Sequence, residues 1–366
     1  MPTLRELTLQ QPGEWMHALE SCAPYDFYHL PQYHAMAEQA GEGAPRLFVY
    51  TEGPHTIALP LLLRNVDGTD WRDATSVYGY PGPLASSDAI PATVVENFQA
   101  AMLDRLRSDR VVTVFSRLHP LLAQRPLLEG LGSFHTSETV SIDLTLPRDE
   151  QRARYRRSFK EAINRLRRAG LTVVHDTAGM YFPDFVRIYT ETMRRVNAAD
   201  RYFFPPSYFE SLRTALGSRM ALFMCLQDGV PVCGGLFVAC NGILQYHLGG
   251  TLDAALALAP MKLVMDEVRL WGNQQGLRVM HLGGGTTADP EDPLLYFKRG
   301  FSDRRHQFAA WRWVVAPDVY RVLCSAVSAV RTDYFPAYRC PAALAMMPSV
   351  AFAAGAATLA GTCHSN

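Results

Sequence analysis

His281–Phe301 reads HLGGGTTADPEDPLLYFKRGF, and the organisation of the whole chain follows from this stretch. A short apolar run ends in three glycines, Gly283, Gly284 and Gly285, and a position without a side chain lets another group approach the backbone closely. An acidic loop with two prolines follows, and then an apolar and aromatic segment that ends in Lys298. A lysine held beside a reacting carbonyl stabilises the oxyanion that forms, because a fixed charge acts strongly where water is scarce. Any one of these residues alone is better explained by a glycine turn, a solvated loop or a core helix, but together they predict a functional site.

The segments upstream of this stretch predict its fold. Three apolar segments are separated by turn dipeptides that are typical of tight hairpins, so we expect an antiparallel meander. They are Met220–Gln227, Val230–Cys240 and Ile243–Leu248, with Asp228-Gly229 and Asn241-Gly242 between them. A helix over Pro260–Gln275 then predicts a crossover, which places a strand over Leu277–Leu282 parallel to the last strand of the meander.

Several short motifs in this half resemble those of a known family. In order they are the segment YHLGGT (Tyr246–Thr251), Ala259-Pro260, Trp271, Gly276, the LGGG run and the final FKRGF. This pattern is similar to the Fem family, the peptidoglycan-bridge aminoacyltransferases, and to their wider acyltransferase relatives. The resemblance covers roughly Asp26–Ala337 and is sharp only over Met220–Phe301. It implies an α/β (α+β) fold of two tandem N-acetyltransferase-like (GNAT-like) domains, with mixed, mostly antiparallel sheets flanked by helices.

The resemblance also implies an activity, the formation of an amide by transfer of an aminoacyl group. The donor would be aminoacyl-tRNA and the acceptor an amine, either of a peptidoglycan precursor or of a peptide natural product. The Phe-Lys pair of the family falls on Phe297 and Lys298, and the lysine is the residue tied to the transition state. Asp292, Glu291 and His281 are candidates for the general base, and substrate or water could also serve.

Two other functions stay open. Acyl-CoA or an acyl carrier is the alternative donor, although Thr251–Pro260 lacks the glycine-rich loop with which acetyl-CoA enzymes hold the pyrophosphate. The other alternative is a tRNA- or nucleotide-binding module without catalytic activity. We expect no tightly bound cofactor and no metal, since the histidines and cysteines show no metal-ligand spacing.

Further residues are expected to contact substrate. The YGYPGP segment contributes two tyrosines, which fit acceptor contacts and aromatic packing in a tight turn equally well. An aromatic loop and the glycine run contribute others, and some of these rings belong to the core. The predicted substrate-binding residues are Tyr78, Tyr80, Tyr202, Phe204, His247, Gly283, Gly284, Gly285 and Tyr296.

A basic helix is predicted between the two halves, with Phe159, Ile163 and Leu166 on its apolar stripe and Gly170 at its end. Around this stripe eight basic residues face one acidic residue, Glu161, which leaves a net charge of plus seven. Such a face is usually only solvated, but it also fits a phosphate-rich partner such as a tRNA acceptor stem or a nucleotide-linked substrate. The predicted phosphate-binding residues are Arg154, Arg157, Lys160, Arg165 and Arg168.

The length of 366 residues suffices for two domains. We expect an N-terminal domain at 1–146, completed by a C-terminal helix at 317–338, a catalytic domain at 147–316 and an apolar tail at 340–366. Basic and acidic residues balance at 35 each, so no overall charge favours DNA. Seven scattered cysteines predict buried thiols in a reducing compartment. With no secretory signal and a tail rich in alanine, we expect a cytoplasmic monomer or homodimer without stable membrane insertion.

Overall fold

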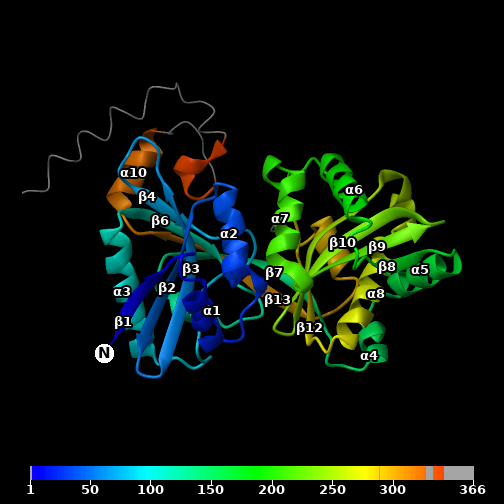
Figure 1. Cartoon of the computed structure of the whole chain (residues 1–366), viewed down its shortest axis with the longest axis horizontal. Helices are drawn as coiled ribbons and strands as arrows, with labels where there is room; N and C mark the ends of the chain where they lie inside the picture. The colour runs from blue at the N-terminus through cyan, green and yellow to red at the C-terminus, as the bar shows by residue number, and fades with distance from the viewer. Residues whose placement is uncertain (1, 288, 327–332, 342–366) are drawn as a thin grey trace, which may run out of the picture. The chain divides into compact units, whose positions relative to one another are not determined.

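The computed structural model describes residues 2–287, 289–326 and 333–341. The chain forms two compact units, the first made of Met1–Thr136 with Phe308–Asn366 and the second of Ser137–Gln307. It passes from one unit to the other within two strands, β7 (Ser133–Asp143) and β13 (Arg305–Val314). Each unit contains a mostly antiparallel sheet with helices on its faces, which confirms the predicted fold class (Figure 1).

The sheet of the first unit has the strand order β1-β2-β3-β4-β6-β13, with β5 paired to β3. Among these pairs only β4 and β6 run parallel. The helix α3 (Ala92–Ser108) places Val94, Phe98, Met102 and Leu106 in the core, at the spacing expected of an amphipathic helix. The other elements are β1 (Thr3–Leu7), α1 (Pro12–Ser21), α2 (Pro31–Gln39), β2 (Ala44–Glu52), β3 (His55–Asn65), β4 (Arg72–Thr75), β5 (Leu84–Ala85) and β6 (Val111–Arg117).

The C-terminal part of the chain packs on this first unit. The helix α10 (Pro317–Ala326) contacts β6, beside which Figure 1 shows it in orange. Farther on, the guanidinium of Arg339 lies 2.7 Å from the buried carboxylate of Asp73, which Arg64 contacts at 2.6 Å from the other side. A carboxylate between two guanidinium groups is compensated in a way that a lone buried charge is not.

The sheet of the second unit has the order β7-β12-β11-β10-β9-β8. Both predicted hairpins are present, and β11 pairs with β12 in parallel as the crossover requires. The helix α6 contacts β10 and β11, while α8 contacts β9, β10 and α5. The bounds are α4 (Arg148–Ala153), α5 (Arg157–Arg168), β8 (Thr172–His175), α6 (Phe182–Arg195), α7 (Pro206–Leu216), β9 (Met220–Gln227), β10 (Val230–Cys240), β11 (Ile243–Thr251), α8 (Met261–Gln274), β12 (Val279–Gly284) and α9 (Pro293–Lys298).

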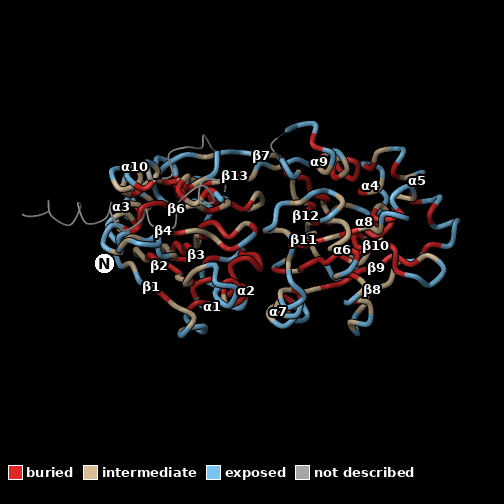
Figure 2. Tube along the Cα trace, turned by 90° about the horizontal axis from the view of Figure 1, so that it is seen from above, coloured by how far each residue is buried: buried red, intermediate tan, exposed pale blue. Residues whose placement is uncertain are grey.

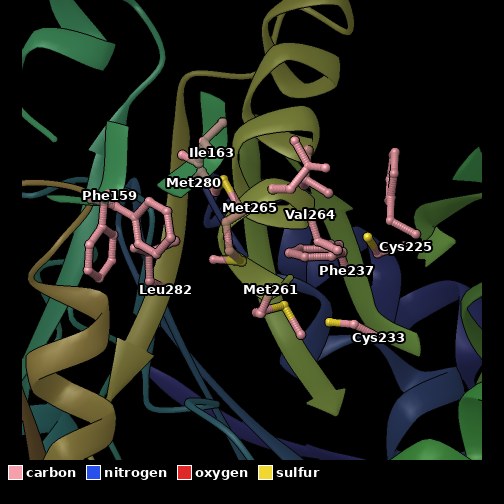
Figure 3. Packing of buried hydrophobic residues seen from close by; sticks show 14 of the residues in the cluster. Phe159, Ile163, Cys225, Cys233, Phe237, Met261, Val264, Met265, Met280 and Leu282 are labelled. Carbon is pink, nitrogen blue, oxygen red and sulfur yellow. The ribbon is translucent and has the colours of Figure 1, made fainter. Parts of the chain in front are cut away.

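The core of the second unit lies between this sheet and the helices α5 and α8. Figure 2 shows β9 and β10 as largely buried strands, and Figure 3 shows the α8 side chains Met261 and Met265 among those of β10 and β12. Phe159 of α5 and Leu282 of β12 belong to the same cluster. The core therefore connects the basic helix, the crossover helix and the strand that leads into the glycine run.

Two features differ from the sequence-based expectations. The basic helix, which was expected to be continuous, consists of two helices, α4 and α5. The break occurs because the backbone amide of Arg156 donates to Gly300 O and so leaves the helical hydrogen-bond pattern. The strands β1, β4, β5 and β8 were not predicted. Of the apolar tail at 340–366, only Cys340 and Pro341 lie within the described residues. No helix in the described part of the chain has the length and apolar character needed to cross a bilayer.

Candidate active site

Asp292 organises the loop between β12 and α9. Its Oδ1 accepts hydrogen bonds from the backbone amides of Leu294 and Leu295, which makes it the N-cap of α9. Its Oδ2 accepts from the backbone amides and hydroxyls of Thr286 and Thr287. Burial alone would raise the pKa of this carboxyl, but the hydrogen bonds outweigh burial and hold the pKa below its usual range. A carboxylate stabilised in this way is a weak base and holds the loop to the helix, and a role of Asp292 as general base stays a prediction.

Lys298 at the end of α9 is buried, with only 7% of its surface exposed. Its Nζ donates a hydrogen bond of 2.6 Å to Gly284 O and lies 5.8 Å from the ring centroid of Tyr246. Burial lowers the pKa of Lys298 to about 7, and the negative charge of Asp292 opposes that shift. The lysine therefore changes its charge near neutral pH.

The three glycines are required by the protein's own packing. Gly283 has a φ of +76°, a conformation that side chains disfavour, and a Cβ there would lie 3.1 Å from Lys298 Nζ. A Cβ on Gly284 would lie 2.7 Å from Glu138 O, and one on Gly285 would lie 2.5 Å from Cγ of Asp292. The sequence suggested that these glycines let a ligand approach the backbone. At Gly284 and Gly285 the space that a side chain would take is filled by Glu138 and Asp292 of the chain itself.

The ladder between β11 and β12 ends early. It runs from the pair Ile243–Val279 to the pair Gln245–His281, where the side chains also meet, with Gln245 Oε1 2.6 Å from His281 Nδ1. β11 then continues to Thr251 beside β10, and its register shift leaves His247 as a bulge. Tyr246 and Gly284, the two groups near Lys298 Nζ, follow the last pair on their respective strands. The ammonium therefore bridges two neighbouring strands just beyond the point where they separate.

The aromatic residues beside Lys298 differ in their surroundings. Phe297 is half-buried against the core, with its ring centroid 5.8 Å from that of Phe159 and 5.2 Å from that of Phe301. Tyr296 is 55% exposed, and the guanidinium carbon of Arg156 lies 4.0 Å from its ring centroid. Phe297 thus packs α9 against the core, and Tyr296 lies on the solvent-exposed side of α9 in contact with Arg156.

The aromatic loop before α7 packs on the second unit's own helices. The ring of Phe204 stacks on Tyr208 with centroids 4.0 Å apart and faces Tyr189 at 6.1 Å. Tyr202 is half-buried, and its carbonyl oxygen accepts a hydrogen bond from the Tyr189 hydroxyl. His247 joins this group through a 3.4 Å contact between its Nε2 and the Tyr208 hydroxyl. The structure therefore connects three predicted substrate-binding residues, Tyr202, Phe204 and His247, through Tyr208 and Tyr189.

Tyr78 and Tyr80 belong to the first unit. The carbonyl oxygen of Tyr78 accepts a hydrogen bond from the Tyr33 hydroxyl, and its side chain is exposed. The ring of Tyr80 makes edge contacts with Tyr28 and Phe308 at centroid distances of 5.7 and 5.4 Å. Of the two explanations offered for the YGYPGP segment, aromatic packing thus describes the contacts of the Tyr80 ring.

The charge of the basic helix is compensated in part by carboxylates, most of which are distant in sequence. Of the predicted phosphate-binding residues, Arg154 pairs with Asp303, Arg157 pairs with Glu161, and Lys160 donates to the carbonyl oxygen of Ala153. Two further arginines, Arg152 and Arg167, share the carboxylate of Asp266 on α8. Arg165 and Arg168 are exposed and form no ion pair with a carboxylate among the described residues.

Two residues near the site were not singled out as site residues from the sequence. Lys262, in the first turn of α8, lies with its Nζ 4.3 Å from the ring centroid of Phe159. Arg156 was counted only as part of the basic helix, and its contact with Tyr296 depends on the break before α5. No local pattern marks either position, since each contact joins segments far apart in the chain. Within the described ranges, no cluster of His, Cys, Asp or Glu could hold a metal ion.

Comparisons with known proteins agree with this architecture. Residues 153–299 match the family model described as an acetyltransferase (GNAT) domain. No curated protein matches the sequence. Among solved structures, FemX is 12% identical with a TM-score of 0.66, and the match covers 87% of this chain and 99% of FemX.

Two further structures match at a TM-score of 0.52, each covering 82% of this chain and 91% of its own. One is the C-terminal domain of a putative lysylphosphatidylglycerol synthetase from Agrobacterium fabrum, 10% identical. The other is L-PGS from Bacillus licheniformis, 14% identical. At these identities the likeness is one of fold. Residues 153–299 thus match a GNAT family model, and the chain has a fold like that of FemX.

Proposed function

We propose that this GNAT-domain protein, which has the fold of FemX, is an acyltransferase that joins the aminoacyl group of an aminoacyl-tRNA to an amine. The observation that carries the proposal is the buried ammonium of Lys298, which lies between Gly284 of β12 and Tyr246 of β11 where the two strands separate. A fixed cation shielded from water is the group that amide formation from an ester needs, because negative charge develops on the carbonyl oxygen.

The reaction balances without an added oxidant or metal. The acceptor nitrogen attacks the carbonyl carbon of the aminoacyl ester and forms the new C–N bond. The negative charge then lies on the carbonyl oxygen, where the protonated Lys298 stabilises it. Collapse of this intermediate breaks the C–O bond to the ribose, and the proton lost by the amine passes to the departing ribose oxygen.

The other site residues hold Lys298 in place or contact the substrates. Asp292 fixes both ends of the loop that leads to Lys298, and its charge favours the protonated lysine. Phe297 holds α9 against the core. We assign acyl or acceptor contacts to the group around Tyr202, Phe204 and His247, and acceptor contacts to Tyr78 and Tyr80. The acceptor is a peptidoglycan precursor or a peptide natural product, and the expected site of action is the cytoplasm.

A second candidate, an N-acyltransferase that uses acyl-CoA or an acyl carrier, is favoured by the match to an acetyltransferase family model. The segment before α8 argues against acyl-CoA. Asp253–Leu258 forms a short 3-10 helix, and Ala259 with a φ of +54° leads into Pro260 and α8. No glycine there exposes consecutive backbone amides to a pyrophosphate.

The deciding experiment offers both donors in parallel. The protein is incubated with mixed labelled aminoacyl-tRNA or with labelled acyl-CoA, together with a panel of amine acceptors, and amide products are identified by mass spectrometry. Label transferred from aminoacyl-tRNA, in a reaction that RNase abolishes, supports the proposal. Transfer only from acyl-CoA establishes the second candidate. No transfer from either donor, together with tRNA binding that is unaffected by replacing Lys298, shows a binding module without catalytic activity.

A further inference from the structure

We refer to three cations of the second unit, Arg156, Arg165 and Lys262, as the cationic cluster, and Arg156 contacts Tyr296 of α9. Arg156 immediately precedes α5, Arg165 lies in its last turn, and Lys262 lies in the first turn of α8. Two of them share one ring, since Lys262 Nζ lies 4.3 Å and Arg156 Cζ lies 5.5 Å from the centroid of Phe159. Arg156 and Lys262 therefore both lie against the ring of Phe159.

Charge compensation separates this cluster from the other basic residues nearby. Arg152, Arg154, Arg157 and Arg167 each lie within 3.2 Å of a carboxylate oxygen. Among the described residues, no carboxylate forms an ion pair with a member of the cluster. Burial lowers the pKa of Lys262, and repulsion from Arg165 and Arg156 lowers it further. The protein thus holds three like charges close together without neutralising them, which costs stability and is relieved when an anion binds.

The cluster is connected to the candidate catalytic lysine through α9. Arg156 contacts the exposed ring of Tyr296 at 4.0 Å, and its backbone amide donates to Gly300 O. Phe159, which supports the cluster, packs against Phe297, the residue before Lys298. An anion bound to Arg156 would therefore lie near the helix that carries Lys298.

We propose that Arg156, Arg165 and Lys262 bind phosphate groups of the carrier that delivers the acyl group. This inference rests on the proposed function, because it assigns the cluster to the donor. Guanidinium groups bind phosphate oxygens in pairs and an ammonium adds a point charge, so two arginines and a lysine suit this ligand. Both possible donors carry phosphates: in tRNA they adjoin the ribose that bears the acyl ester, and in CoA they lie at the other end of the pantetheine arm from the thioester. In this proposal the side chains of the cluster bind the donor phosphates, whereas acetyl-CoA enzymes bind them with the backbone amides of a glycine-rich loop.

The test measures donor binding separately from transfer. The probes are deacylated bulk tRNA and CoA, and dissociation constants for the full chain are measured at several salt concentrations. The variants are the double substitution Arg156→Gln with Lys262→Gln and the single substitution Arg165→Gln, whose exposed position keeps the fold intact. Arg187→Gln is the matched control, because Arg187 is an exposed arginine of the same unit that pairs with Asp184 on α6 and lies outside both the cluster and the predicted site residues.

The proposal predicts that the double variant weakens tRNA binding about tenfold or more and lowers the salt slope by about one for each cation removed. Arg165→Gln shows a smaller loss, and the control binds like the wild type. Weakened binding of CoA in place of tRNA assigns the same cluster to the other carrier. Equal binding by wild type and variants, or no binding of either probe by the wild type, overturns the proposal.

These outcomes are distinct from a failure of the proposed function. If Lys298→Ala abolishes transfer while the cluster variants keep the wild-type dissociation constant and KM for the donor, the cluster assignment is wrong and the function stands. If no donor yields an amide while the cluster variants still lose tRNA binding, the cluster assignment stands and the function is wrong.

Discussion

Lys298 Nζ donates a 2.6 Å hydrogen bond to the carbonyl oxygen of Gly284, and this contact joins the end of α9 to the end of β12. The pair places a group that titrates near neutral pH where β11 and β12 have stopped pairing. Both sequence positions were prominent in the glycine run and the FKRGF segment, but only the fold shows that they meet.

The pH dependence of transfer should report the charge of Lys298. Because its pKa is lowered to about 7, the ammonium is present below this pH and is lost as the pH rises through it. Arginine stays charged throughout, so Lys298→Arg removes this titration. We predict that the ratio of wild-type to Lys298→Arg kcat/KM falls between pH 6 and pH 9. A ratio that rises with pH would assign Lys298 the role of a base.

The buried ammonium should also cost stability. The pKa of Lys298 is lower in the folded chain than its ordinary value of 10.5, so the folded protein holds fewer protons between about pH 7 and that value. The wild-type free energy of unfolding therefore rises with pH across this window, and the full cost of the buried charge is present below it. Lys298→Met should raise Tm by about 2 °C or more at pH 6, with a smaller gain at pH 9. Equal Tm values at pH 6 would show that the burial cost is absent.

Asp292→Asn tests the positioning role of the carboxylate. Asparagine keeps one accepting oxygen but loses the charge and the hydrogen bonds to the other oxygen, which are either the two from Leu294 and Leu295 or the four from Thr286 and Thr287. We predict a loss of about 1–3 kcal/mol in unfolding free energy at pH 7. Since the folded pKa of Asp292 is depressed, this difference should vanish as the pH falls through the acid range.

The same variant distinguishes positioning from base catalysis. Removing the negative charge also lowers the pKa of Lys298 further, so the alkaline loss of activity should move to lower pH. A general base would instead be shown by a large fall in kcat with unchanged stability and an unchanged alkaline limb.

Gly284→Ala tests the packing explanation of the glycine run. The added Cβ would approach Glu138 O to 2.7 Å, so β12 or its neighbour β7 must move. We predict a destabilisation of about 1–3 kcal/mol in denaturant unfolding together with reduced transfer. Gly13→Ala is the control, because nothing lies within 4 Å of its Cβ position and it should leave stability almost unchanged.

Local chemistry explains what the sequence could predict of the fold. The hairpin between β9 and β10 has Asp228 and Gly229 at φ values of +51° and +78°, and Asn241 and Gly242 repeat the pattern at +47° and +82°. Asp, Asn and Gly adopt a positive φ at little energetic cost, so the two dipeptides were sufficient to predict both turns. The crossover and the parallel strand β12 followed from the meander.

Tertiary contacts explain what the sequence could not predict. Within its own segment the basic helix has Glu161 as its one acidic residue, whereas in the fold the carboxylate of Asp266, about a hundred positions away, pairs with Arg152 and Arg167. Asp292 was visible as an acid in a loop, but whether a loop acid is a base or a cap depends on its hydrogen bonds. Lys262 belongs to no sequence motif, and it becomes a candidate binding residue only because the fold places it at the Phe159 ring beside Arg156.

The most direct test of the account is single-turnover transfer from aminoacyl-tRNA to an amine acceptor at pH 6.5, with wild type, Lys298→Ala and the control Arg187→Ala. Arg187 is charged, lies exposed on α6 and pairs with Asp184. We predict that Lys298→Ala slows amide formation about a hundredfold or more while donor binding and folding are retained, and that the control reacts within about twofold of wild type. A folded Lys298→Ala protein that forms the amide at the wild-type rate would contradict the central claim.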